Sequence, residues 1–210
     1  MIQLDKEEIK EILVAVLVIA LAFTMASWVR TQDVAQLPYL FFIALVSVGT
    51  GFVFHELAHR AVARHYGAFA AFKAWTTGLA LALMTSVFGM VFAAPGAVYI
   101  FGRHLTVEQN GKISLAGPLT NLILALVFLA LLVVVRGLWG IETAAGQFAY
   151  ALTQSGFFIN AWLGLFNMVP LFPLDGEKIL RWNPLAWAVT GGVLFLLVFS
   201  PNLLLNLVGG

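Results

Sequence analysis

Long apolar runs constrain the fold of this chain more than any other feature. Five runs are about the length that a helix needs to cross a bilayer, roughly 20 residues. They lie at Ile12–Val29, Pro38–His59, Ile113–Val135, Gln147–Met168 and Pro184–Leu207. Of the 210 residues, 61% are hydrophobic and only 10% are charged, so too few charges remain to cover a water-exposed surface. The sequence therefore predicts an all-α polytopic membrane protein.

A sixth apolar stretch, residues 77–98, is interrupted by Gly78, Gly89, Pro95 and Gly96. If this stretch re-enters on the side that it left, and the N-terminus is cytoplasmic, nine of the eleven Lys and Arg residues lie on the cytoplasmic side. If the stretch crosses, the split becomes six to five. Because basic residues concentrate on the cytoplasmic side, the pattern favours about five transmembrane helices plus a re-entrant membrane hairpin. Six spans are the alternative.

Length and composition also exclude several classes of protein. The chain suits a single membrane-embedded domain over residues 1–210, without a separate soluble module. A formal net charge of +1 argues against nucleic acid as a partner, since nucleic-acid binding needs a concentrated basic face. The chain has no cysteine, which excludes disulfides, thiolate metal ligands and cysteine nucleophiles. The first apolar run has no cleavage pattern after it and is expected to be a first span rather than a signal peptide.

The second run ends in the sequence HELAH, residues 55–59, where ionisable side chains cluster at the end of a predicted span. Helical residues four apart project from one face with a rise of about 6 Å, so His55 and His59 can bind one Zn²⁺. Glu56 is then placed to take a proton from water activated by the metal. The alternative is a polar cluster that reaches the headgroups with the help of Arg60. That alternative does not explain two histidines and a glutamate on adjoining faces.

A catalytic zinc usually has three protein ligands, and the third must here be a histidine or a carboxylate. Several candidates lie in predicted surface loops or at the opposite end of the spans: His65, His104, Asp33, Glu142 and Glu108, the last in a predicted turn. Asp175 and Glu177 instead follow the run that ends at Met168, at the predicted depth of the two histidines. Gly176 permits a close turn after Asp175, which favours Asp175. The alternative for Asp175 is a helix-capping carboxylate.

Three segments together resemble the site-2 protease family of intramembrane zinc metalloproteases, peptidase family M50. They are HELAH at 55–59, AGPLTN at 116–121, and NMVPLFPLDG at 167–176. Their order and their placement on spans also match, over about residues 38–180. The resemblance implies a catalytic core over that range, with residues 12–29 and 184–207 as accessory spans. The chain resembles the minimal prokaryotic or archaeal members.

The resemblance also implies the roles of particular residues. His55, His59 and Asp175 would bind one Zn²⁺ per chain, and Glu56 would act as the catalytic base. Asn121 would face the site as a further catalytic residue, where its amide could stabilise an oxyanion or hold the substrate backbone. The alternative for Asn121 is a hydrogen bond between helices, which is common for asparagine in membranes.

In this family, the apolar stretch at 77–98 corresponds to a membrane-inserted strand or loop. We expect it to present an edge strand to an extended substrate. Proline substitutions along Leu79–Met84 or Val91–Tyr99 should then reduce turnover more than zinc binding.

The expected function is hydrolysis of peptide bonds within or next to the transmembrane helix of single-span membrane-protein substrates. The expected location is the plasma membrane, as a multi-pass protein in contact with lipid, with the active site toward the cytoplasm. The alternatives are a metal-ion transporter and a non-catalytic membrane scaffold. Transporter sites tend to lie near the midplane of folds with internal repeats, and this sequence shows no repeat.

Overall fold

The computed structural model describes residues 6–92, 95–101 and 105–200. Its helices are α1 (Lys6–Thr31), α2 (Leu37–His65), α3 (Thr76–Ser86), α4 (Val107–Val134), α5 (Ala144–Asn167), α6 (Asp175–Trp182) and α7 (Pro184–Phe199). A 3-10 turn, η1 (Val34–Gln36), precedes α2, and a π-helical turn, η2 (Val135–Trp139), follows α4. The strands are β1 (Phe69–Ala74) and β2 (Gly96–Phe101).

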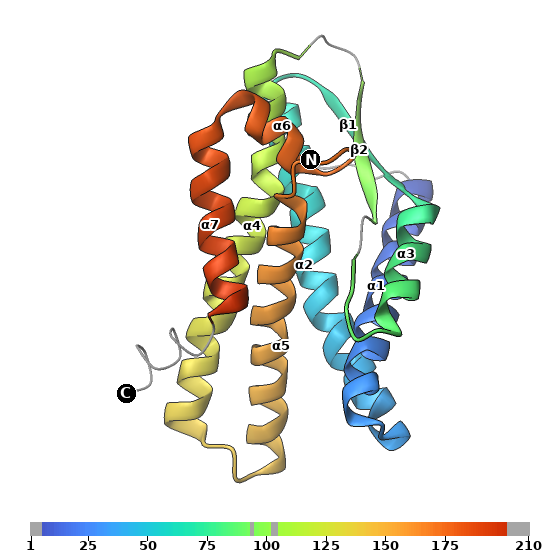
Figure 1. The fold of residues 1–210 in the computed structure, drawn as a ribbon, viewed down its shortest axis with the longest axis vertical. Helices are drawn as coiled ribbons and strands as arrows, with labels where there is room; N and C mark the ends of the chain where they lie inside the picture. Colours follow the sequence, from blue (N-terminus) through green and yellow to red (C-terminus); the bar gives the residue numbers. More distant parts are fainter. Residues whose placement is uncertain (1–5, 93–94, 102–104, 201–210) are drawn as a thin grey trace.

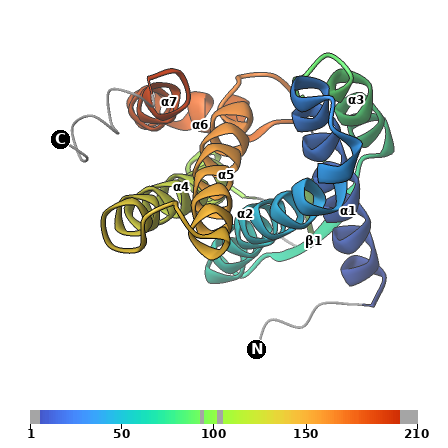
Figure 2. The ribbon, with the colours of Figure 1, turned by 90° about the horizontal axis from the view of Figure 1, so that it is seen from below.

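Helix α2 lies at the centre of the molecule, between α1 on one side and α4 and α5 on the other (Figures 1 and 2). Helix α3 packs against α1, and α7 packs against α5 and α6. Helix α1 packs against its neighbours with small side chains, and Ala15, Ala20 and Ala22 are fully buried. Small residues let helix backbones approach closely where lipid offers no hydrophobic driving force. This arrangement puts the inward face of α2 in contact with elements from both halves of the chain.

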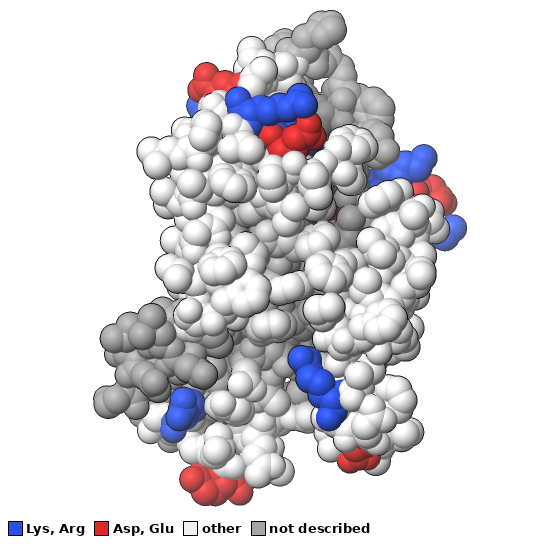
Figure 3. Space-filling view, in the orientation of Figure 1, with Lys and Arg blue, Asp and Glu red and all other residues white. Residues whose placement is uncertain are grey.

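On the face shown in Figure 3, charged side chains gather toward the two ends of the molecule and leave a broad uncharged belt between them. Most of the described basic residues belong to the end that holds the start of α1, the end of α2, the strands and α6: Lys6, Lys10, Arg60, Arg64, Lys73, Lys112, Lys178 and Arg181. Arg30 and Arg136 belong to the other end, and Arg103 lies outside the described residues. This is the distribution expected for the re-entrant topology.

The predicted apolar runs coincide with helices. Among the described residues, three helical segments are long and apolar enough to cross a membrane, Lys6–Thr31, Val34–His65 and Val107–Gly137. Helix α5 has 24 residues but is less apolar, and α7 has 16 described residues. The last part of the predicted run at 184–207 lies outside the described residues. A helical membrane protein is thus confirmed, and the exact number of crossings stays a prediction.

Trp75 and Pro95, near the two ends of the apolar stretch, lie next to each other. Strands β1 and β2 pair antiparallel, with Ala74 opposite Gly96. Next to this pair, the Trp75 N–H donates to the Pro95 carbonyl at 2.9 Å. The described flanks of the apolar stretch therefore lie side by side, as expected for a hairpin, while its re-entry into the membrane stays a prediction.

The expectation of a strand in residues 79–84 is wrong, because these residues belong to helix α3. Alanine, leucine and methionine are strong helix formers, and Leu79 and Ala82, three residues apart, are buried in the cluster formed with α1. The strands flank this helix instead, so the all-α prediction is correct except for this two-stranded sheet.

The turn predicted at Glu108 is also wrong, because helix α4 begins there. Thr106 caps the helix by accepting from the Gln109 N–H, and the Gln109 side chain accepts from the Thr106 N–H. This capping box has the spacing Thr-x-x-Gln, a start signal that is visible in the sequence. Glu108 pairs with Lys112 one turn later, at 2.6 Å.

Candidate metal centre

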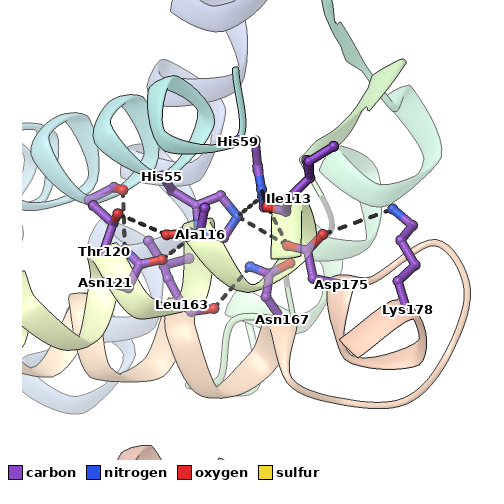
Figure 4. A network of polar contacts seen from close by, with 11 residues as sticks. His55, His59, Ile113, Ala116, Thr120, Asn121, Leu163, Asn167, Asp175 and Lys178 are labelled. Carbon is purple, nitrogen blue, oxygen red and sulfur yellow. Dashed lines mark hydrogen bonds and ion pairs between the residues drawn. The ribbon is translucent and has the colours of Figure 1, made fainter. Parts of the chain in front are cut away.

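Two histidines of α2 and one aspartate of α6 meet in the interior (Figure 4). The Nε2 atoms of His55 and His59 are 2.9 Å apart. Oδ2 of Asp175 lies 3.4 Å from the first of them and 3.1 Å from the second. All three side chains are buried, and their ligand atoms lie within 4.8 Å of one another. A single ion can therefore reach all three.

The turn between α5 and α6 delivers Asp175 to the histidines. Leu174 occupies the N-cap position of α6 without a side-chain cap, and Asp175 points toward the imidazoles (Figure 4). A Cβ on Gly176 would run into the carbonyl of Met168, so only glycine permits this close turn. The carboxylate that could have capped α6 thus belongs to the metal centre.

The charges around Asp175 keep it ionised. Burial by itself raises the pKa of this carboxyl, but the charge and hydrogen bond of His59, together with those of His55, hold the pKa well below its usual value. Lys178 lies nearby, with Nζ 3.9 Å from Oδ1. Glu177, the other carboxylate considered, instead pairs with Arg181 at 2.7 Å.

The Nδ1 atoms of both imidazoles are held by groups on α4. Nδ1 of His59 lies 2.7 Å from the Ile113 carbonyl, and Nδ1 of His55 lies 2.6 Å from Oδ1 of Asn121. These oxygens can only accept, so Nδ1 carries the proton in both neutral imidazoles, and both Nε2 lone pairs are then free to bind a metal. Such outer contacts fix the tautomer and the orientation of metal-ligating histidines.

Asn121 continues this contact into a chain of amides that joins three helices. Its Nδ2 donates to the Gly51 carbonyl on α2 at 3.1 Å and to Oδ1 of Asn160 on α5 at 3.2 Å. Asn160 in turn donates to the Gly156 carbonyl at 2.8 Å. Both asparagines are fully buried. The hydrogen bond between helices that was the alternative for Asn121 is therefore present, while a contact with substrate stays a prediction.

Glu56 lies beside the two histidines and lines the same cavity. The cavity has a volume of about 40 Å³ and is bounded by α2, α4, the start of β2 and the turn between α5 and α6. This is enough for water, because one water molecule needs roughly 10–15 Å³ of such space. Oε2 of Glu56 is buried, and no hydrogen-bond partner for it lies within the described part of the chain. A buried carboxylate oxygen of this kind calls for a proton donor, such as water, in the cavity.

Gly117 lets α4 pass directly beside the imidazoles. A Cβ at this position would lie 2.5 Å from ring atoms of both His55 and His59. Non-bonded contacts of a Cβ atom essentially never become this short, so a larger residue would move the rings.

The residues present fit a catalytic zinc. Two imidazole nitrogens and one carboxylate oxygen form a common ligand set for it, and three protein ligands leave a position for water or substrate. The structure brings together His55, His59 and Asp175 as ligand candidates, with Glu56 and Asn121 next to them; their catalytic roles stay predictions. His65 is exposed at the end of α2, and His104 lies outside the described residues.

Sequence reasoning missed Asn160 as part of this site. The available signal was an asparagine within an apolar helix, because polar side chains are costly in a membrane segment and tend to face the bundle interior.

Comparisons with known proteins agree with this geometry. The chain is 45% identical over 188 residues to the candidate zinc metalloprotease MJ0611 of Methanocaldococcus jannaschii, a match that covers 89% of this chain and 90% of the relative. It is 34% identical over 162 residues to the candidate zinc metalloprotease YwhC of Bacillus subtilis, covering 69% of this chain and 68% of the relative. Zinc metalloprotease MJ0392 of Methanocaldococcus jannaschii is 30% identical over 142 residues, which cover 68% of this chain and 33% of the relative. No family model matches the chain. No solved structure matches it either.

Proposed function

The chain belongs to the site-2 protease family of zinc metalloproteases, and we propose that it cleaves peptide bonds within or next to the membrane-spanning helix of its substrates. Zinc is the metal cofactor, held by the two histidines and the aspartate of the centre. The observation that carries the proposal is the position of this centre: it lies in a small, buried cavity of a helical membrane protein, with the carboxylate of Glu56 beside it.

Glu56 and Asn121 have different roles in the proposed hydrolysis. When bound, zinc would polarise the scissile carbonyl and make water more acidic. Glu56 accepts the proton of the attacking water and passes it to the leaving amine. Asn121 holds His55 in the orientation that points Nε2 toward the ligand position. The side chains of the centre are buried, which strengthens these electrostatic contacts.

The substrate has to present an extended segment at the cavity, since the carbonyls of a helix are already hydrogen-bonded. Pro95 and Gly96 line the cavity together with the histidines, so the start of β2 borders the metal position. A substrate strand that pairs with β2 would place its backbone next to the ligands. This supports strand addition as the mode of substrate binding.

The charge distribution supports one orientation in the membrane. The end of the molecule that holds the metal centre also holds most of the described basic residues, and basic residues favour the cytoplasmic side. We therefore propose that the active site faces the cytoplasm, in a multi-pass protein of the plasma membrane.

The test is zinc-dependent cleavage of a single-span model substrate in liposomes, by wild-type protein and by Glu56→Gln. We expect Glu56→Gln to bind zinc as the wild type does and to lose cleavage by at least about a hundredfold, the usual size of a general-base contribution. Asp175→Asn should weaken zinc binding itself.

Zinc binding by both proteins without cleavage by either would contradict the proposed function. A zinc flux assay on the same liposomes would then test the transporter alternative, and substrate capture without cleavage would point to a scaffold.

A further inference from the structure

The outer edge of strand β1 is bound by two carboxylates of helix α1. Oε1 of Glu8 accepts from the Phe72 N–H at 2.9 Å, and Oε2 of Glu11 accepts from the Ala74 N–H at 2.7 Å. Oε1 of Glu8 also accepts from the guanidinium of Arg60 at 2.5 Å. These contacts occupy two of the backbone donors that a third strand would need on this side of the sheet.

The register then fixes which backbone groups point away from the sheet on β2. In an antiparallel pair, facing residues either exchange hydrogen bonds or both point outward. The amides of Phe72 and Ala74 point to α1, away from β2. The backbone N–H and C=O groups of their partners, Val98 and Gly96, therefore point away from β1, at the opposite edge of the sheet. The backbone groups of Ile100, two residues after Val98, point to the same edge. The described part of the chain contains no third strand paired with this edge.

Glu8 ties the hairpin to the metal-binding helix. Arg60 follows the ligand His59 directly in α2, and both members of the ion pair between Glu8 and Arg60 are buried, with 8% and 3% of their surface exposed. One carboxylate thus joins α1, α2 and β1. Movement of β1 relative to the histidines would break a buried, charge-assisted contact.

Strand β2 is held close to β1 by the absence of a side chain at Gly96. A Cβ there would lie 2.5 Å from the Phe72 ring and would also overlap the Lys73 carbonyl. Gly96 lines the cavity that contains His55 and Glu56. The outward edge of β2 therefore begins at the metal centre, whereas the outward edge of β1 faces α1 (Figure 1).

We propose that Glu8 and Glu11 are positioning residues that determine where substrate binds. They close the β1 edge and clamp the hairpin to α2, so that an extended peptide segment adds at β2, through the backbone groups of Gly96, Val98 and Ile100. The proposal rests on the proposed function, because it concerns the substrate of that same centre. What it adds is that two carboxylates of α1 leave the edge of β2, and not that of β1, for the substrate.

The first test locates the substrate by disulfide formation. The chain has no cysteine, so Lys73→Cys on β1 and Ala97→Cys on β2, which are register partners, each provide a single thiol. Adjacent strands are about 4.8 Å apart, and a disulfide spans Cα atoms up to about 6.8 Å apart. A substrate strand on β2 can therefore reach position 97 but not position 73, which lies two strands away.

The substrate carries one cysteine, moved over three consecutive positions near the cleavage site, and is trapped by the Glu56→Gln variant. We expect disulfides at position 97 and none at position 73. Equal disulfide formation at both positions, or preferential formation at 73, would overturn the proposal. Zinc-dependent cleavage by the wild type, without disulfides at either position, would overturn it too while the proposed function stands.

The second test asks whether the contacts of Glu8 and Glu11 with β1 position the edge of β2 for the substrate. Glu11→Leu removes the acceptor for the Ala74 N–H, and Glu11→Gln keeps an oxygen there as the matched control. We expect Glu11→Leu to speed amide exchange at Ala74 and to raise KM by about tenfold, roughly the value of one hydrogen bond, with zinc content and kcat retained. Glu11→Gln should resemble the wild type. An unchanged KM in Glu11→Leu, or parallel loss of zinc and kcat, would count against the proposal.

Discussion

At the scale of single residues, the metal centre depends on groups that never touch the metal. His55 and His59 come from α2, but the oxygens that hold their Nδ1 atoms, on Asn121 and Ile113, come from α4. Asn160 on α5 then holds Asn121. Helices α2, α4 and α5 therefore have to pack correctly before the Nε2 atoms of His55 and His59 can point to one position.

The amide chain predicts a role for Asn160 in zinc binding. In Asn160→Ala, Nδ2 of Asn121 loses one acceptor and the amide is less firmly oriented toward His55. Losing an outer contact of this kind typically costs about 10- to 100-fold in metal affinity, and we expect a loss in that range by competition with a chelator. Gln154→Ala, an exposed position on the same helix, is the control. Equal zinc affinity in the two variants would show that the chain does not orient His55.

Gly117 should be similarly sensitive, for steric reasons. In Gly117→Ala, the added methyl would meet both imidazole rings, so we expect zinc binding to be lost or greatly weakened and stability to fall by about 1–3 kcal/mol. Gly192→Ala on α7, where a Cβ meets nothing within 4 Å, should retain zinc. Zinc titration and thermal unfolding of both variants measure these effects, and normal zinc binding by Gly117→Ala would contradict the packing described.

The pH dependence of zinc binding should come from the imidazoles and not from Asp175. The histidines hold the pKa of this carboxyl below its usual value, so it stays ionised from pH 8 down to pH 5. Imidazoles have to be neutral to bind zinc, and their ordinary pKa is about 6.5. Zinc affinity should therefore fall as the pH drops below about 6.5, by roughly tenfold per pH unit for each imidazole that protonates.

In Asp175→Asn, calorimetric titration should show weaker zinc binding at every pH, but zinc affinity should change with pH as steeply as in the wild type. A pH dependence that disappears in this variant would mean that Asp175 is the group that titrates.

At the scale of elements, two connections build the site. The turn from α5 to α6 places a carboxylate against α2, and the hairpin places β2 at the cavity. Both depend on close backbone contacts that only glycine permits, at Gly176 and Gly96. The helices supply the ligands, and these two connections supply the third ligand and the edge for substrate.

The strand register predicts opposite effects for prolines at neighbouring positions of β2. Val98→Pro removes an amide that points away from β1, whereas Tyr99→Pro removes one that faces Ala71 across the ladder. Because proline is tolerated only where no ladder donor is needed, Val98→Pro should keep the hairpin and the zinc, and should lower the cleavage rate at least about tenfold. Tyr99→Pro should disrupt the hairpin itself. Cleavage rates, zinc content and amide exchange of β1 distinguish the two variants, and wild-type cleavage by Val98→Pro would argue against strand addition.

At the scale of the whole molecule, charged side chains toward the two ends flank an uncharged belt on the face shown in Figure 3. The metal centre lies toward the end where α2 finishes and α4 begins. A position near one end gives the cavity a short route to water, while the belt keeps the rest of the protein in lipid.

This arrangement predicts that the two ends of α4 are on opposite sides of the membrane. Lys112→Cys and Arg136→Cys lie near the start and the end of the segment Val107–Gly137, whose 31 residues span about 46 Å as a helix. A membrane-impermeant thiol reagent should label position 136 in intact spheroplasts and position 112 in inverted vesicles. Labelling of both from the same side would contradict the topology, and the reverse pattern would place the active site on the outer side.

The sequence by itself determined the class of protein and most of the candidate ligands. Apolar runs of bilayer length set the positions of α1, α2, α4, α5 and α7, because a span has to satisfy its backbone internally. The four-residue spacing of His55 and His59 places both side chains on the same face of a helix. Helical period and hydrophobicity are local properties, so a single chain reveals them.

The tertiary structure decided what depends on contacts between distant segments. Residues 79–84 form a helix against α1 because burial, not the apolar composition alone, set their conformation. Asp175 faces the histidines instead of capping α6, Asn121 bonds to other helices, and Asn160 joins it. The edge of β1 is closed by carboxylates that lie over 60 residues away in sequence. Such pairings follow from packing in three dimensions, and no spacing along the chain encodes them.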